Sequence, residues 1–560
     1  MLRYLPALTV GLFVGPVVFG LLGTLLPAFG YLPALGSEEF SLEPWRRLLA
    51  APGLATAVQV TLSTGFASTV IALALTTLLF AAGHGTAAFD RIRRGMVPLL
   101  AVPHLALAVG LAFLIAPSGW LVRLVAPWPT GWQTPPDIPL VQDPLGLALA
   151  FGLVLKEIPF LVLMIFGALG QVRAEPQLRM ACSLGYGPVQ AWLKVVLPQV
   201  YPQIRLPVYA VLAYALSVVD MALVLGPTTP PTLACLVFRW FQDPDLSMRF
   251  QAAAGAVLQL GIVALAIALW RALDAVIGRL ARPWLLHGGR GGRGRAPRVA
   301  AWAGVAIMFG CAFGAVLGLA VWSMAQRWRF PDALPQSWSM ARWPDQLAAL
   351  AGPTWTTLAV GVAATGISVA LVAGCLENES RRQQRPGARA LALLYVPLLV
   401  PQIGFLFGVQ VLFLWLGLAD GWLAVIWTHL LFVLPYVFLT LADPYRSLDM
   451  RYARTALALG KAPWLVWLRI KLVMLLRPLL NAMAVGFAVS VAQFLPTLFA
   501  GGGRFATLAT ETLSLAGGGD RRIIGVFGFA LAALPFVGFA LALAATAWRF
   551  RDRRAMRVGN

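Results

Sequence analysis

Charged residues are scarce in this chain, since Asp, Glu, Lys and Arg make up only 12% of its 560 residues. A soluble globular domain carries about 25%. Hydrophobic residues reach 59%, and the mean hydropathy is +0.79. The composition therefore excludes an ordinary soluble globule and predicts an all-α polytopic membrane protein.

Cysteine and histidine are also few, and both are dispersed. No CxxC pair occurs among Cys182, Cys235, Cys311 and Cys375, which argues against a disulfide framework and against a thiolate metal site. The chain has no G-x-x-x-x-G-K-[ST] motif, so it does not carry the phosphate-binding loop of ATPases. We therefore expect no metal, no cofactor and no catalytic residues in this chain.

Long apolar runs are what the chain has in abundance. A helix of roughly 20 residues crosses a bilayer, and about twelve such segments can be placed. Arg3 precedes the first, but its apolar length exceeds the about 7–15 residues of a signal peptide, so we predict a retained anchor. The predicted spans are 6–29, 54–82, 97–117, 144–169, 205–226, 250–278, 299–323, 353–376, 390–415, 421–442, 478–500 and 523–548.

The net charge of +21 is distributed in a way that favours a membrane over nucleic acid. With the N-terminus inside, most Lys and Arg residues fall on cytoplasmic segments, as the positive-inside rule expects. Both termini are then predicted to be cytoplasmic. The basic clusters are predicted to contact anionic lipid headgroups; they are 91–94, 279–298, 381–382 and 549–557.

The chain reads as two similar halves. The Gly/Arg-rich stretch 281–298 near its midpoint is predicted to be a cytoplasmic linker between a first half, 1–280, and a second half, 299–560. About six spans in each half is an even number, so the two repeats enter the membrane in the same direction. Matching pieces include QVTLSTG (59–65) with TTLAVG (356–361), and Val102-Pro103 and Gly110 with Val400-Pro401 and Gly408.

A short basic segment lies between the fourth and fifth predicted spans of each half. In 174–198, Glu175 and Pro176 can begin a helix, Gly185 can end it, and Pro188 can begin another. The second copy has Gly460 and Pro463 at the corresponding places. We expect two bent, amphipathic cytoplasmic elbows suited to inserting into a groove on a soluble partner.

These segments resemble the EAA loop of binding-protein-dependent ABC importer permeases, whose pattern is E-A-A-x-x-x-G, then a basic residue and I/V-x-L-P. The first copy matches at Ala181, Gly185 and Lys194, and the second at Ala456, Gly460 and Arg469. Both copies depart from the pattern at its first position, which is Arg179 in one and Arg454 in the other. A partner that meets these arginines should present acidic or neutral groups.

The resemblance covers roughly 54–278 and 353–548, and the fused arrangement is similar to that of ferric-iron and thiamine permeases. The opening LLPAFGYLPALG resembles that of YnjC-type permeases. The resemblance implies a type I importer in the bacterial inner membrane. An ABC ATPase homodimer would dock on the two loops and use the ATP, and a periplasmic binding protein would deliver a small solute.

Polar groups inside the predicted spans are candidates for the translocation pathway, because burying them in lipid is costly. Asp220 lies in the fifth span, and Gln493 is its counterpart in the second half. Asp220 could line the pathway or pair within the bundle, for instance with Lys156. His104 is predicted to be a hydrogen-bonded packing residue.

The main alternative is a proton-coupled secondary transporter of the major facilitator type, which also has two parallel halves. The piece FDRIRR (89–94) resembles that family's loop signature, but the second half has ENESRRQQRPG at the corresponding place. That alternative leaves the paired elbows unexplained. An integral membrane enzyme would need a cluster of His, Asp or Cys, and the sequence has none.

Overall fold

The computed structural model describes every residue except 1, 292–294, 385–386, 420, 550 and 552–560. Helices dominate the described part, which confirms the all-α polytopic prediction. The only strands described are β1 (Ala325–Arg327) and β2 (Ser337–Trp338), which pair antiparallel outside the helical bundles.

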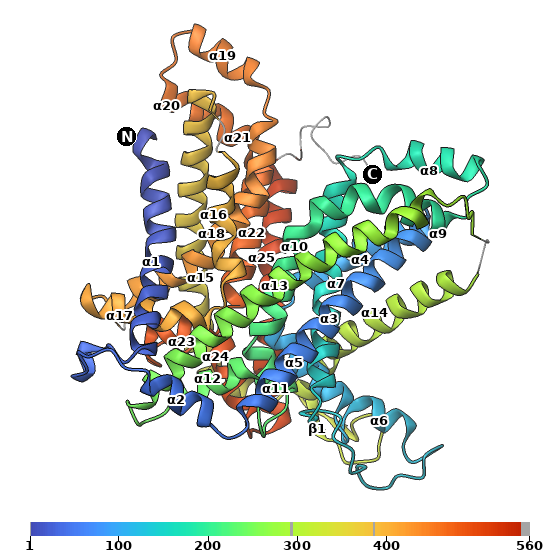
Figure 1. The fold of residues 1–560 in the computed structure, drawn as a ribbon, viewed down its shortest axis with the longest axis vertical. Helices are drawn as coiled ribbons and strands as arrows, with labels where there is room; N and C mark the ends of the chain where they lie inside the picture. The colour runs from blue at the N-terminus through green and yellow to red at the C-terminus, as the bar shows by residue number, and fades with distance from the viewer. Residues whose placement is uncertain (1, 292–294, 385–386, 420, 550, 552–560) are drawn as a thin grey trace.

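Figure 1 shows the helices of the two predicted halves. In the first half they are α1 (Leu5–Ala28), α2 (Glu43–Ala50), α3 (Leu54–Gly83), α4 (Ala87–Ala101), α5 (His104–Ile115), α6 (Trp120–Val125), α7 (Leu147–Leu169), α8 (Ala174–Ser183), α9 (Pro188–Ala191), α10 (Leu197–Ser217), α11 (Asp220–Leu225), α12 (Leu233–Phe241) and α13 (Met248–Leu286). In the second half they are α14 (Arg295–Met324), α15 (Arg342–Arg382), α16 (Ala388–Leu399), α17 (Ile403–Trp415), α18 (Trp422–Arg446), α19 (Met450–Ala458), α20 (Pro463–Val466), α21 (Leu472–Met474), α22 (Leu476–Val491), α23 (Leu495–Gly501), α24 (Leu508–Ala516) and α25 (Arg521–Arg549).

The predicted spans fall on helices, but several of them are interrupted. Among the described residues, nine helices are long and apolar enough to cross a membrane, or up to eleven if each of two bent pairs counts as one span. The predicted number was higher because 205–226 is divided between α10 and α11. The α16–α17 pair bends by 109° at Val400-Pro401, since proline cannot continue the hydrogen-bond ladder of a helix.

The first helix of each half packs against the other half. Helix α1 lies along α17, and α14 lies along α5. The contacts are close because both use glycine: a Cβ on Gly23 would lie 2.8 Å from the Gly408 Cα, and a Cβ on Gly110 would collide with the Ala315 carbonyl. Small residues allow such approaches between membrane helices. The two halves are therefore interlocked rather than side by side.

The stretch predicted to be the linker overlaps the ends of two helices. Helix α13 continues to Leu286, and α14 begins at Arg295. Among the described residues of the stretch 281–298, those outside helices are 287–291. Residues 292–294 fall outside the described part of the chain. Arginine, leucine and alanine in 279–286 (RLARPWLL) favour continued helix, which extends past Pro283, and the glycines that follow His287 end it.

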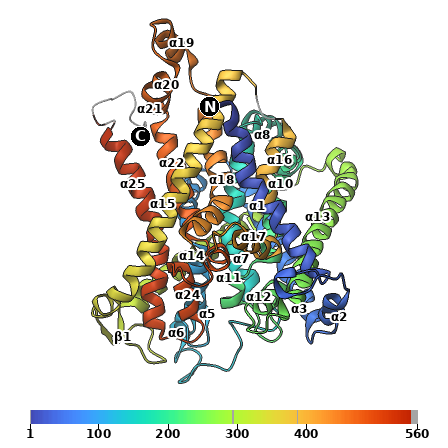
Figure 2. The ribbon, with the colours of Figure 1, turned by 90° about the vertical axis from the view of Figure 1, so that its left-hand side faces the viewer.

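Two segments reach the same end of the molecule on opposite sides, namely α8–α9 and α19–α20. Figure 1 and Figure 2 both show α8 and α19 at this end, together with the start of α1 and the end of α25. Helix α6 and strand β1 lie at the other end. The fold thus presents one end with both predicted elbows and a second end made of interhelical loops.

Candidate functional site

Both predicted elbows are present, and we define the first elbow as residues 174–196 and the second as 449–471. In the first, α8 ends at Ser183, Gly185 has a φ of +89°, and α9 begins at Pro188. In the second, α19 ends at Ala458 and Gly460 has a φ of +77°. These left-handed glycines confirm the predicted helix ends, because L-residues with a side chain rarely adopt this backbone conformation.

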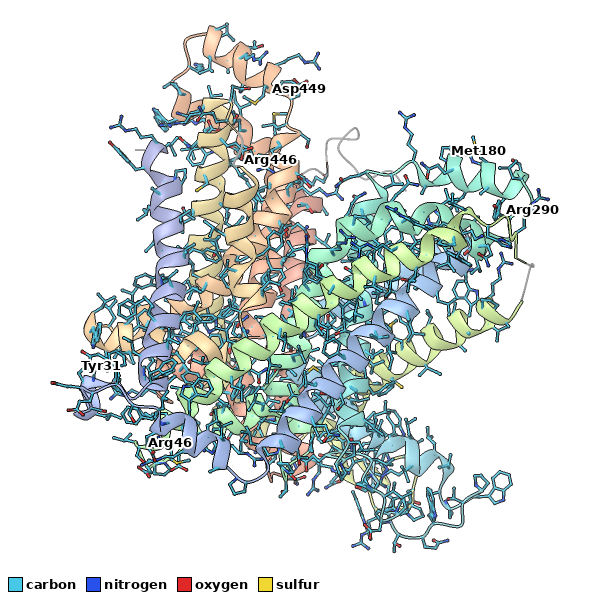
Figure 3. The ribbon with its side chains drawn as sticks, viewed as in Figure 1. Tyr31, Arg46, Met180, Arg290, Arg446 and Asp449 are labelled. Atoms are coloured by element: carbon cyan, nitrogen blue, oxygen red, sulfur yellow. The ribbon has the colours of Figure 1, made fainter. Side chains whose placement is uncertain are left out.

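Each elbow buries a small face and exposes an apolar tip. Ala181 and Ala456 are buried, at 6% and 8% exposure. The tip of the first elbow exposes Met180 and Leu184, at 67% and 59%, and Leu459 of the second is 75% exposed. Leu184 and Leu459 occupy corresponding positions, so both tips expose a large apolar side chain at the same place. Figure 3 shows Met180 on the outer side of α8.

The two arginines that depart from the family pattern are both exposed. Arg179 lies 3.7 Å from Glu175 one turn earlier, and Arg454 lies on the exposed face of α19. An exposed pair of this kind contributes about 0–1 kcal/mol, so Arg179 is available to a partner. The second elbow begins with Asp449, which accepts a hydrogen bond from the Arg451 N–H at 3.0 Å. The Arg451 guanidinium also binds Asp449 and lowers the pKa of its carboxyl group.

The basic residues predicted to be equivalent lie in different surroundings. Lys194 donates hydrogen bonds to the carbonyls of His287 at 2.8 Å and Gly289 at 3.1 Å. Arg469 is exposed on the second elbow. The sequence pattern treats Lys194 and Arg469 as equivalent. In the structure Lys194 is hydrogen-bonded to backbone carbonyls, whereas Arg469 is exposed.

Each elbow continues into its span through a π-helical turn that the sequence analysis missed. These turns are Trp192–Val196 (η3) and Trp467–Lys471 (η4), separated by the same offset as the two glycines. Such turns are rare and are often found at functional sites. The repeated W-L-[KR] at 192–194 and 467–469 was a signal that could have located them.

An apolar aromatic cluster fixes the first elbow to the membrane helices. Trp192 is 1% exposed, and its ring centroid lies 5.9 Å from that of Phe80 at the end of α3. Phe80 in turn packs at 5.0 Å against Phe89 of α4 and at 5.0 Å against Phe166 of α7. The first elbow is therefore packed onto α3 and, through Phe80, linked to α4 and α7.

A buried ionic network attaches the second elbow to the membrane helices. The Lys471 ammonium lies 2.8 Å from the Glu377 carboxylate, and these side chains are only 5% and 2% exposed. Glu377 also accepts hydrogen bonds from Arg381 at 2.7 Å and from the Tyr445 hydroxyl at 2.6 Å. The network ties the elbow to α15 and α18. The first half has Ala81 and Val196 at the places of Glu377 and Lys471.

Asp220 and Gln493 lie at breaks in the fifth span of each half. Asp220 begins α11 after the interruption at Val218-Val219, and Gln493 lies between α22 and α23. Both side chains are half-buried. The Asp220 carboxylate interacts with Tyr214, and the Gln493 amide donates a hydrogen bond to the Val489 carbonyl at 3.2 Å.

Lys156 binds a helix end, which bears on the alternative that it pairs with Asp220. Its ammonium donates hydrogen bonds to the carbonyls of Leu100 at 3.1 Å and Val102 at 2.5 Å, where α4 gives way to α5. A cation at a helix C-terminus is stabilised by the unsatisfied carbonyls there. The Lys156 protons are thus directed to the backbone. The His104 ring packs 4.8 Å from the Tyr214 ring, next to the break.

Comparison with known proteins gives a match over almost the whole chain. No protein family model matches the chain. The inner membrane ABC transporter permease protein YnjC of Escherichia coli (strain K12) is 30% identical over 525 residues. The alignment covers 93% of this chain and 94% of that protein.

Proposed function

Because this chain belongs to the family of ABC transporter permeases of the inner membrane, we propose that it is the membrane subunit of a binding-protein-dependent importer. A permease is a transport component and not itself an enzyme. Hydrolysis of ATP would take place on a separate ATPase, and a small solute would cross between the two halves by alternating access.

The observation that carries this proposal is the pair of elbows. Both expose apolar side chains at the same end of the molecule, and both are packed rigidly onto several spans. A partner that moves the two tips toward each other would rotate the helices attached to them. Two copies of one ATPase subunit suit a site that occurs twice.

We place the solute pathway at the interrupted fifth spans. Helix breaks expose backbone groups that need polar surroundings, and at membrane depth such breaks are found where they line a cavity. Asp220 and Gln493 lie at these breaks in corresponding positions. A periplasmic binding protein would release its solute at the end opposite the elbows.

The test is to capture the ATPase at each elbow. Ser183→Cys and Ala458→Cys variants of the full chain, with the four native cysteines replaced, are cross-linked in membranes, and the products are identified by mass. We expect one ATPase polypeptide at both positions and none at Trp128→Cys, which is 86% exposed at the other end. ATP hydrolysis by the purified complex should rise when the soluble binding protein is added.

The secondary-transporter alternative is not favoured, because the family membership and the paired elbows both point to an ATPase-driven permease. It would regain support from uptake that follows a proton gradient in vesicles lacking any ATPase polypeptide. The absence of a captured ATPase at both elbows would overturn the importer proposal.

A further inference from the structure

The segment that joins the two halves lies on the first elbow. We define the linker turn as residues 287–291, the described part of the connection between α13 and α14. The Gly187 N–H, at the bend of the elbow, donates a hydrogen bond to the Arg290 carbonyl at 2.9 Å. A hydrogen bond between backbones so far apart in sequence fixes one segment against the other.

Lys194 holds the linker turn from the second arm of the elbow. Besides its hydrogen bonds to His287 and Gly289, its ammonium lies 5.0 Å from the Trp284 ring centroid and 5.7 Å from that of Tyr186. Two carbonyls and two aromatic faces form a complete site for an ammonium group. Lys194 therefore acts as a positioning residue for the linker turn.

The linker turn also contacts the elbow through side chains. A Cβ on Gly185 would lie 3.3 Å from the Arg290 Cδ, so the Arg290 side chain passes over the bend. Gly291 has a φ of +63°, and a Cβ there would collide with the Gln190 side chain. Only glycine fits at position 291 without displacing one segment from the other.

The second elbow has no such cover among the described residues. Nothing lies within 4 Å of a Cβ on Gly460. Its second arm is held by α15 instead, where the Arg381 guanidinium donates a hydrogen bond to the Pro463 carbonyl at 3.1 Å. The two elbows share the left-handed glycine at the bend. They differ in the segment that holds them, which is the linker turn for the first elbow and α15 for the second.

The linker turn leaves the apolar tip of the first elbow free. Met180 and Leu184 stay exposed, and Figure 3 shows Arg290 near the same end of the molecule as Met180. A partner that contacts the tip would therefore meet the Arg290 side chain beside it. The linker turn adds a cation to the docking surface without blocking it.

We propose that the linker turn is a structural part of the first ATPase-docking surface: it fixes the second arm of the first elbow and presents Arg290 to a carboxylate-bearing groove on the ATPase subunit. This inference rests on the proposed importer function. It means that two identical ATPase subunits meet two unlike surfaces, one braced by the linker turn and one braced by α15.

The experiment compares matched variants of the full chain that carry the Ser183→Cys or Ala458→Cys cross-linking site. Gly291→Ala should lower ATPase capture at position 183 several-fold and leave capture at 458 unchanged. Gly288→Ala is the control, because nothing lies within 4 Å of a Cβ there. Lys194→Met should act like Gly291→Ala, whereas Arg469→Met should leave capture at 183 unchanged. Arg290→Gln should make capture at 183 less sensitive to added salt.

Three outcomes would overturn this inference while leaving the importer proposal standing. They are unchanged capture at 183 in both Gly291→Ala and Lys194→Met, equal losses at 183 and 458, and an equal loss in the Gly288→Ala control. Failure to capture an ATPase at either position in the parent chain is a different result, because it overturns the importer proposal itself.

Discussion

At the scale of single residues, Gly460 is a position where a substitution would strain the backbone without removing a side-chain contact. Its φ of +77° suits glycine, and nothing lies within 4 Å of a Cβ built on it. Valine there would strain the backbone by about 1–3 kcal/mol without a clash. We expect Gly460→Val to uncouple ATP hydrolysis from uptake, with near-normal amounts of folded protein. Asparagine tolerates the left-handed conformation, so Gly460→Asn should restore most of the coupling.

The measurement is the number of ATP molecules hydrolysed per solute taken up in reconstituted vesicles. Normal coupling in Gly460→Val would show that the sharp bend is dispensable. A loss of folded protein in both variants would show that the position serves stability instead.

The buried pair of Glu377 and Lys471 gives a second residue-scale prediction. Removing one partner leaves a buried charge, which costs about 3–5 kcal/mol, although Arg381 still binds Glu377 here and should keep the loss near the lower end. We expect Lys471→Met to shorten the half-life of the purified protein on mild heating. The double variant Glu377→Ala/Lys471→Val copies the Ala81 and Val196 of the first half and should recover part of the loss.

If the double variant were less stable than Lys471→Met alone, the pair would contribute more than its desolvation costs. Unchanged stability in Lys471→Met would contradict the prediction and point to the Arg381 contact as sufficient.

At the scale of elements, the exchange of α1 and α14 between the halves depends on close glycine contacts. Valine at position 23 would press on the Gly408 backbone of α17, and overpacking of this kind costs about 1–3 kcal/mol. We expect Gly23→Val to lower the thermal stability of the purified chain. Gly15→Val on the same helix is the control, because nothing lies within 4 Å of a Cβ there.

Equal stability of the two variants, measured as the temperature at which half the protein loses its monodisperse state, would contradict the packing of α1 on α17. A larger loss in Gly15→Val would show that the tight contact of α1 is made near Gly15 rather than near Gly23.

The elements show which parts of the fold were readable from sequence. Long apolar runs predicted the helices because lipid demands internal hydrogen bonding from every span. Gly185, Gly460 and the prolines after them predicted the elbows, since these residues act through local backbone geometry. The exchange of α1 and α14 could not be predicted, because it depends on which of many small-residue faces meet.

The site was predicted less completely than the fold. The pattern that marked Lys194 and Arg469 as equivalent carries no information on segments distant in sequence. Lys194 donates hydrogen bonds to the linker turn, whereas Arg469 is exposed. Likewise Glu377 and Lys471 are 94 positions apart, so their pairing follows only from the packing of α15 against the second elbow.

At the scale of the whole molecule, the orientation in the membrane is predicted from the distribution of charge and can be tested with a native residue. Most arginines and lysines were assigned to the side that holds both termini, and both elbows lie at that end in Figure 2. Cys182 is exposed on the first elbow, whereas Cys235 is buried and Cys311 and Cys375 are partly buried. Cys182 is therefore a natural reporter of the elbow side.

We expect a membrane-impermeant maleimide to label Cys182 in inside-out vesicles and not in spheroplasts, since the positive-inside rule places the elbows in the cytoplasm. The readout is a mass shift of the full chain, with Cys182→Ser as the background. Trp128→Cys in the Cys182→Ser chain should show the reverse pattern, because it lies at the other end and is 86% exposed. Labelling of Cys182 in spheroplasts would show that the elbows face the outside of the cell. A cytoplasmic ATPase could not reach them there.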